Sequence, residues 1–276
     1  MYRWELEKRT YPLKFVWKIS RGQSSDKTLN FVKLTKDGKQ VWGEIAGITT
    51  DESKNQFLES EWKRFLEANP QSLEEIFNLE LPTHLEFGTS SAMTHFLAAE
   101  ENQTLSDFLG VSDFSSLSTS FSLPILKTEE LAPFFEKFEL SRFPALKLKV
   151  SHKLSHENCH ELAQLYNGPI RVDANESFES ADEVLLFMDQ IKDLNIQFIE
   201  EPLKRNSEEE YKKLKMASPI PIFADESIQR DIFDEGFKDQ FHGINVKLMK
   251  AGSYQRALHN IEKAKELAKK HGLMMI

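Results

Sequence analysis

The chain has 276 residues, of which 40% are hydrophobic and 29% are charged, and its formal net charge is -9. This length allows a large core with an added domain, and the composition is that of a globular protein. No apolar run approaches the roughly 18 residues of a membrane span, and the negative charge disfavours nucleic acid and anionic membranes as partners. A single cysteine, Cys159, excludes an internal disulfide, and the N-terminus has no signal-peptide core, so the cytoplasm is expected.

The first 45 residues have the composition of short strands separated by polar turns. Strands are predicted at residues 2–8, 15–19, 29–34 and 41–44, with a turn at residues 36–39. Short strands that follow one another in this way predict a small antiparallel sheet.

From about Asp51 to Gly110 the apolar residues recur at helical spacing, with Phe57, Trp62 and Phe65 on one face. The N-terminal sheet and these helices together predict an α+β domain over residues 1–113. A Ser-rich stretch follows at residues 114–118, and it predicts a connection into a second domain over residues 114–276.

The second half repeats one pattern: a short apolar run, a charged residue and then a polar stretch suited to a helix. Strands are predicted at residues 119–125, 145–150, 169–172, 196–199, 220–224, 244–248 and 272–276. The charged sites recur every 22 to 27 residues, which is the length of one strand, one helix and two loops. The fold class is therefore α/β, with a (β/α) barrel. Eight strands close such a barrel, so the chain is expected to stop before the last strand.

Three acidic residues follow three of these strands: Asp173, Glu200 and Asp225. A single acid at a strand end is more often a helix cap or a solubilising loop residue. Three acids at one mouth of a barrel instead offer hard oxygen ligands, which suit Mg²⁺. The sequence therefore predicts a magnesium site.

Lysines lie on both sides of these acids. Lys147 and Lys149 alternate with Leu148 and so point to one face of a strand, and Lys247 ends a later strand. Charges on a strand covered by helices are costly unless opposite charges meet them. A lysine facing a dication would have a lowered pKa and could act as a base.

The motifs that contain these residues resemble the enolase superfamily, and in particular its muconate lactonizing enzyme subgroup. The resemblance rests on Lys147-x-Lys149, Asp173-x-Asn175, Glu200-Glu201-Pro202, Asp225-Glu226-Ser227 and Lys247. It implies an enolase-type (β/α) barrel with an N-terminal α+β capping domain. It also implies Mg²⁺ on the three acids, a small carboxylate as substrate, and lysines on either side of its acidic carbon.

Other residues receive roles from the same resemblance. Lys149 is expected to remove the α-proton, and Lys147 to lower the pKa of Lys149 by like-charge proximity. Arg21 lies where the superfamily has a lid and could bind a substrate carboxylate, although a basic loop without function is an equal alternative. Asn175 could orient a ligand or the substrate, or simply form a turn. Alternation points Glu201 and Glu226 away from the mouth, so both are expected to support the ligands or form ion pairs.

One further motif is rejected. His156-Glu157-Asn158-Cys159-His160 matches the H-E-x-x-H pattern of zinc proteases. It follows a barrel strand and belongs to an outer helix, away from the mouth, and no third ligand follows at a recognised spacing. His152 lies on the same side, so adventitious metal binding remains an alternative.

Two activities fit the subgroup. Ser20-Arg21-Gly22 and Phe87-Gly88 resemble o-succinylbenzoate synthase, a lyase of menaquinone biosynthesis that removes water after abstracting an α-proton. The segments from Asp173 to Phe178 and from Asn245 to Lys250 resemble dipeptide epimerases, which usually carry an acidic pair beyond the end of this chain. We predict the synthase, with the epimerase as the alternative. A barrel without catalysis, serving as a scaffold, is the third possibility.

Overall fold

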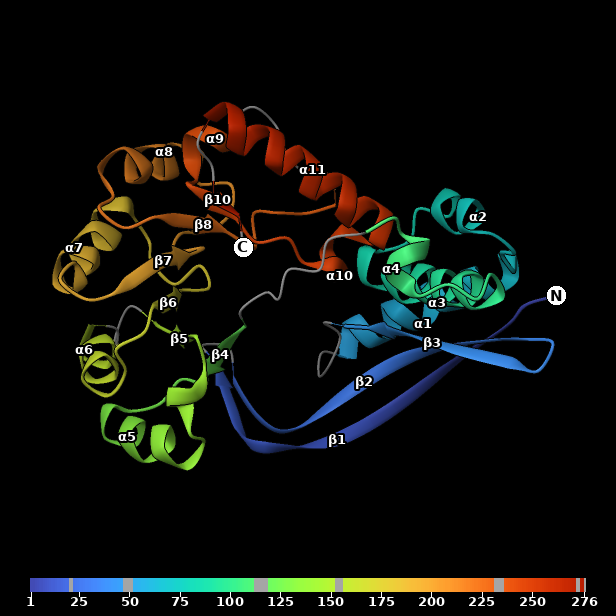
Figure 1. Cartoon of the computed structure of the whole chain (residues 1–276), viewed down its shortest axis with the longest axis horizontal. Coiled ribbons are helices and arrows are strands. Elements are labelled where there is room, and N and C mark those ends of the chain that lie inside the picture. Colours follow the sequence, from blue (N-terminus) through green and yellow to red (C-terminus); the bar gives the residue numbers. More distant parts are fainter. Residues whose placement is uncertain are drawn as a thin grey trace.

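The computed structural model describes residues 1–19, 22–46, 52–111, 119–151, 156–230, 236–271 and 274–275. An N-terminal antiparallel sheet with helices adjoins a larger unit of parallel strands and outer helices (Figure 1). The domain boundary predicted between residues 113 and 114 lies outside the described residues. Within the described residues, no helix is long and apolar enough to cross a membrane.

The N-terminal sheet has three strands, β1 (Arg3–Ile19), β2 (Gly22–Lys36) and β3 (Lys39–Ile45), in the order β1-β2-β3. The strands predicted at residues 2–8 and 15–19 form one long strand, β1, whose register with β2 shifts between Pro12 and Trp17. Proline cannot donate a hydrogen bond to a ladder, and β1 tolerates it because it lies at the sheet edge.

Four helices follow: α1 (Glu52–Ala68), α2 (Leu73–Asn78), α3 (Thr83–Glu100) and α4 (Leu105–Phe108). Most of α3 is buried, including polar residues such as Glu86, Thr89 and Ser90. It packs closely on β3, because a Cβ added at Gly43 would lie 2.0 Å from the carbonyl oxygen of Gly88. Helix α3 therefore has protein on more than one side, which explains its lack of a distinct polar face.

The larger unit alternates strands and helices. The strands are β4 (Ser120–Leu123), β5 (Ala145–Lys149), β6 (Ile170–Asp173), β7 (Ile196–Glu200), β8 (Ile222–Ala224), β9 (Gly243–Ile244) and β10 (Met274–Met275). The helical segments are α5 (Thr128–Lys137), the 3-10 turn η1 (Leu140–Arg142), α6 (His156–Leu165), α7 (Ala181–Ile191), α8 (Glu208–Ala217), α9 (Phe237–Gln240), α10 (Leu248–Ala251) and α11 (Tyr254–His271).

These seven strands pair in parallel in the order β10-β9-β8-β7-β6-β5-β4, which is simply their order along the chain. Each predicted strand has a counterpart, but the one predicted at residues 244–248 is reduced to Gly243–Ile244, because the chain turns into α10 after Lys247. The carboxyl ends of parallel strands lie at one edge, so residues after consecutive strands are brought together there.

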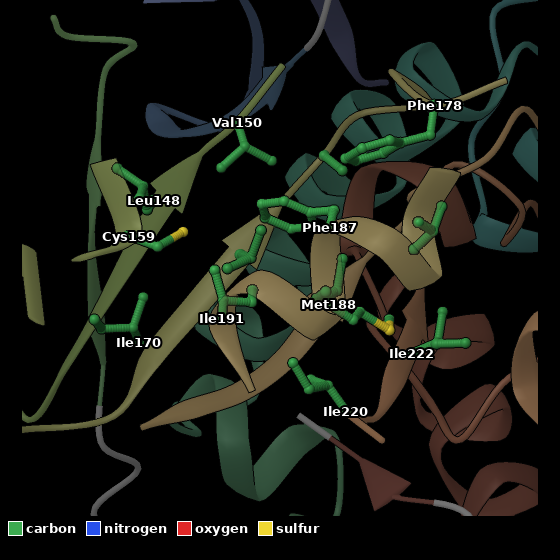
Figure 2. Packing of buried hydrophobic residues seen from close by; sticks show 14 of the residues in the cluster. Leu148, Val150, Cys159, Ile170, Phe178, Phe187, Met188, Ile191, Ile220 and Ile222 are labelled. Atoms are coloured by element: carbon green, nitrogen blue, oxygen red, sulfur yellow. The ribbon is translucent and has the colours of Figure 1, made fainter. Parts of the chain in front are cut away.

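The outer helices bury an apolar stripe against the sheet. In α7 the buried residues Val184, Phe187, Met188 and Ile191 recur at helical spacing, and the Ser180 side chain caps the helix by accepting the N–H of Glu183. Phe187, Met188 and Ile191 pack among strand residues such as Ile170 and Ile222 (Figure 2). The core thus fixes the strands, while polar groups remain for their ends.

Candidate active site

Neighbouring strands place three of the predicted residues in one row. In the ladder between β5 and β6, Lys149 is opposite Asp173, and in the next ladder Asp173 is opposite Glu200. All three are the last residues of their strands. Side chains in equivalent positions of paired parallel strands lie on the same face, so the row converges at the barrel mouth.

Lysines connect the acids within this row. The Lys147 ammonium lies 3.0 Å from Asp173 Oδ2 and 2.7 Å from Glu200 Oε2, and the Lys149 ammonium donates to Asp173 Oδ2 at 2.9 Å. The acids are almost fully buried, with 3% of Asp173 and 1% of Glu200 exposed. Buried carboxylates require such partners. The structure therefore brings together the two lysines and the first two acids as predicted.

The third acid is held by two further lysines. Lys247 and Lys250 each form an ion pair with Asp225, and Lys247 also lies 3.9 Å from Glu200 Oε1. Lys250 additionally donates to the Asp225 carbonyl oxygen at 2.7 Å. Lys247 was predicted to end a strand, and this is wrong: β9 ends at Ile244, and Lys247 is the N-cap of the short helix α10. That helical turn is what brings Lys250, three residues later, to the same acid.

The pKa values reflect this crowding of charges. Burial, opposed by Lys147 but reinforced by the neighbouring acids Asp173 and Asp225, raises the pKa of Glu200 to about 7. Burial also acts on Asp225, but Lys247 and Lys250 outweigh it and hold its pKa well below the usual range. Burial alone would lower the pKa of Lys147, yet Asp173 and Glu200 outweigh it and raise that pKa.

The acids fit a hard divalent cation in their chemistry. Asp173 Oδ1 is buried and has no hydrogen-bond partner, so it is an available oxygen donor within the site. In the part of the chain that the structure describes, however, no three His, Cys, Asp or Glu side chains are already grouped to hold a metal. Lysine ammonium groups bridge the acids instead, and a bound cation would replace some of these contacts.

Asn175 contacts a lysine of the site. Its Oδ1 accepts a hydrogen bond from Lys149 Nζ at 2.6 Å, and its Nδ2 donates to Glu226 Oε1 at 3.2 Å. It therefore lies between Lys149 and the loop after β8. Its left-handed backbone, with φ of 45°, also agrees with the turn role that the sequence left open.

Sequence reasoning missed two polar groups of the site. Asn245 donates to Glu200 Oε1 at 3.1 Å, and Lys250 is paired with Asp225 as described above. Both flank Lys247 at spacings of two and three residues. The spacing could have indicated both residues. Asn245 is two residues before Lys247, which is the period of a strand, and Lys250 is three residues after it, which is close to one helical turn. The change from strand to helix at Lys247 was not predicted.

Glu201 supports the site rather than entering it, as alternation predicted. Its Oε2 accepts the backbone N–H of Asp225 at 2.6 Å and of Ser227 at 3.0 Å, and its Oε1 accepts the Tyr211 hydroxyl at 2.9 Å. The whole Glu201 residue is buried. Burial raises the pKa of Glu201, while the hydrogen bonds to Ser227, Asp225 and Tyr211 oppose that rise.

Two sequence expectations concern residues away from this cluster. Arg21 lies outside the described residues, so its predicted contact with substrate remains a prediction. His156 and His160 lie on the outer helix α6, and His160 Nε2 bonds the carbonyl oxygen of Gln190 at 2.9 Å. That position is where the rejection of the H-E-x-x-H motif placed them. His152 is also outside the described residues.

Comparison with known proteins shows the family to which the chain belongs. Residues 130–276 match the family model described as enolase C-terminal domain-like, and the chain belongs to this family. The predicted membership of the enolase superfamily and the predicted α/β fold of enolase type are thus confirmed.

Individual relatives are dipeptide epimerases. The chain is 28% identical to a hydrophobic dipeptide epimerase of Flavobacteria bacterium, over 98% of this chain and 80% of the relative. It is 27% identical to an L-Ala-D/L-amino acid epimerase of Maribacter sp., over 94% and 78%. A crystal structure of the dipeptide epimerase from Cytophaga hutchinsonii, complexed with Mg and the dipeptide D-Ala-L-Val, has a TM-score of 0.82 at 22% identity, over 99% and 77%.

The predicted o-succinylbenzoate synthase activity is wrong, and its place in menaquinone biosynthesis is withdrawn with it. The curated relatives that match nearly the whole chain are epimerases, which was the stated alternative. A Cβ at Gly88 would lie 2.5 Å from Ile45 Cγ1, so this glycine, which contributed to the resemblance to the synthase, allows α3 to pack closely on β3. The expectation of an enolase-superfamily enzyme stands, since these relatives are enzymes.

Proposed function

We propose that the chain is an Mg²⁺-dependent epimerase that inverts an α-carbon of a dipeptide. The observation that carries the proposal is the position of two lysines on either side of Glu200. Lys149 comes from β5, on one side of the acidic row, and Lys247 follows β9, on the other. Inversion requires a proton to leave one face of a carbon and another to arrive at the opposite face, and this arrangement offers a group for each.

Asp173, Glu200 and Asp225 would hold the metal ion, with water and substrate completing its coordination. When bound, the ion supplies positive charge to the substrate carboxylate, which makes the neighbouring α-proton more acidic. The unpartnered Asp173 Oδ1 supports this donor set, and so does the Mg in the Cytophaga hutchinsonii structure.

Lys149, as the neutral amine, would remove the α-proton and become an ammonium group. Lys247, as the ammonium, would donate a proton to the opposite face and become neutral. For the opposite epimer the two roles exchange. Lys147 would remain an ammonium, because its contacts with Asp173 and Glu200 favour the charged form, and would hold those carboxylates in place. Asn175 would orient Lys149 through its hydrogen bond.

A dipeptide is the small-molecule carboxylate that this proposal assigns as substrate, and Arg21 remains a candidate for binding its carboxylate. The division into a capping domain, residues 1–113, and a barrel domain, residues 114–276, belongs to the same proposal. A cytoplasmic location, with neither nucleic acid nor membrane as a partner, remains a prediction from the sequence.

The test is a panel of L-Ala-containing and hydrophobic dipeptides, incubated with the protein and Mg²⁺ and analysed for epimers by chiral chromatography. Inversion of at least one dipeptide, and its loss in excess chelator, is expected. No inversion and no α-proton exchange on any carboxylate would favour a scaffold protein without catalysis.

A further inference from the structure

Helix α3 of the N-terminal unit buries a glutamate against the larger unit. Glu86 is 0% exposed, and its two carboxylate oxygens are taken by two guanidinium groups: Arg230 pairs with Oε2 and Arg256 with Oε1. Such a buried triad often stabilises a fold less than apolar residues of similar volume would, but removing one partner leaves an uncompensated buried charge and is strongly destabilising. Figure 1 shows α3 beside α10 and α11.

Each arginine belongs to a segment that leaves the active-site edge. Arg230 lies five residues after Asp225, and it donates a second hydrogen bond to the Leu81 carbonyl oxygen at 2.6 Å. Its own carbonyl oxygen accepts a hydrogen bond from Asn260 Nδ2 at 3.0 Å. The loop after β8 is therefore held between the N-terminal unit and α11.

Arg256 reaches the segment after β9. Besides Glu86, it donates to the Ala251 carbonyl oxygen at 3.3 Å, at the end of α10. The N–H of Ala251 in turn bonds the Lys247 carbonyl oxygen at 3.0 Å. A continuous chain of one ion pair and two hydrogen bonds thus connects the N-terminal unit to a lysine of the site, through Glu86, Arg256, Ala251 and Lys247.

Two contacts next to Glu86 hold the same turn. Ser90 Oγ donates to the Gly252 carbonyl oxygen at 3.1 Å, and Gly252 has a left-handed backbone with φ of 86°. A Cβ on Gly252 would meet Glu86 Oε1 at 3.0 Å. The turn is therefore fitted closely around the Glu86 carboxylate. Within the part of the chain that the structure describes, the hydrogen-bond and ion-pair partners of Lys147 and Lys149 on β5 are Asp173, Asn175 and Glu200, none of which belongs to α3.

We propose that the Glu86–Arg230–Arg256 triad positions one side of the active site, namely the segments that carry Asp225 and Lys247, while the Lys149 side does not depend on the triad. Glu86 is thus a positioning residue that links the N-terminal unit to one of the two proton carriers. This inference rests on the proposed epimerase function for its kinetic consequence, but its structural consequence can be measured without activity.

The first measurement uses the metal-free protein. Trace acetylation of lysines, read by peptide mass spectrometry, is compared in the wild type and in Glu86→Gln. We expect labelling of Lys247 to accelerate by at least about threefold, because local loosening exposes its ammonium group, while labelling of Lys149 is unchanged. Glu100→Gln is the matched control, since Glu100 is on the same helix and its ion pair with Lys36 is exposed.

The second measurement uses α-proton exchange in D₂O from each epimer of a dipeptide with Mg²⁺. Lys247→Ala first identifies the epimer whose exchange depends on Lys247. In Glu86→Gln we expect the exchange rate of that epimer to fall by about tenfold relative to the other, since small misplacements of a catalytic group have large kinetic effects. Glu100→Gln should leave the ratio unchanged.

If Glu86→Gln does not fold, Arg256→Lys keeps the charge but loses the two-pronged donor, and the same changes are expected at smaller size. Equal acceleration of Lys149 and Lys247 labelling, or an unchanged exchange ratio in an active enzyme, would overturn the inference. If the wild type exchanges neither epimer of any dipeptide, the proposed function fails, and the labelling result alone decides whether the triad positions Lys247.

Discussion

The carboxylate of Glu201 accepts the backbone N–H of Asp225 at 2.6 Å, so the residue after β7 fixes the residue after β8. The same oxygen also accepts the N–H of Ser227; the contact with Asp225 is buried and the one with Ser227 is partly buried. A predicted metal ligand is thereby oriented through its main chain as well as through its side-chain ion pairs. The first prediction follows from this arrangement.

Glu201→Met should lower the free energy of unfolding by about 3 kcal/mol, because the buried N–H of Asp225 and the partly buried N–H of Ser227 lose their acceptor. Glu201→Gln is the matched control, since its amide oxygen can still accept both N–H groups. We expect a clearly smaller loss for Glu201→Gln in urea denaturation followed by circular dichroism. Equal losses for the two variants would show that the hydrogen bonds to Asp225 and Ser227 do not carry the effect.

The second prediction concerns the metal. Glu200→Gln should abolish Mg²⁺-dependent epimerisation while the fold is retained, because a central oxygen ligand loses its charge and the deeply buried carboxylate is replaced by a neutral group of the same shape. Epimerisation assays and isothermal titration with Mg²⁺ measure the loss of activity and of metal binding, and circular dichroism shows whether the fold is retained. Wild-type activity that persists in excess chelator would refute the magnesium assignment.

The third prediction concerns Lys250, which pairs with Asp225 three residues after Lys247. Lys250→Met should weaken Mg²⁺ binding or turnover less than Lys247→Met does, because Lys250 holds a carboxylate whereas Lys247 is proposed to move a proton. We expect a fall in kcat of roughly tenfold for Lys250→Met and of at least about a thousandfold for Lys247→Met. A larger loss at Lys250 would reverse the two roles.

The fourth prediction uses the buried thiol of Cys159, whose pKa burial raises to about 12. The pKa of this thiol is higher in the folded protein than in the unfolded chain, where it is near 9. The contribution of the buried neutral thiol to stability is therefore fully present below pH 9 and is lost as the pH rises toward 12. Between pH 8 and pH 10 the wild type should therefore lose about 1 kcal/mol more stability than Cys159→Ala. Parallel stability curves for the two proteins over this range would contradict the prediction.

Most of the barrel and of the charged site could be predicted from sequence because parallel strands impose a simple rule. Apolar runs at even spacing give the strands, and a charge at the end of each run must lie at the shared edge, as Asp173 and Glu200 do. The ion pairs of Lys147 and Lys149 then follow from the cost of burying charge.

The remaining features depend on contacts between segments far apart in the chain. Glu86 lies in a helix whose sequence gives no sign of its two arginine partners, which are 144 and 170 residues away. The single strand β1 combined two predicted strands, because Pro12 is tolerated at a sheet edge that the sequence does not reveal. The choice of the synthase rested partly on the resemblance of the Phe87-Gly88 segment, in which Gly88 packs against Ile45, a contact that the sequence does not reveal.

The most direct test of the central claim, that Lys149 and Lys247 transfer protons on opposite faces of one carbon, is epimerisation of a dipeptide by the wild type in D₂O with Mg²⁺, starting separately from each epimer. Proton NMR and mass spectrometry then report the isotope at the α-carbon of the first product formed. Two separate lysines predict that this product carries solvent deuterium in both directions, because the proton removed by one lysine is not the one delivered by the other. A product that retains the original protium in either direction would contradict the account.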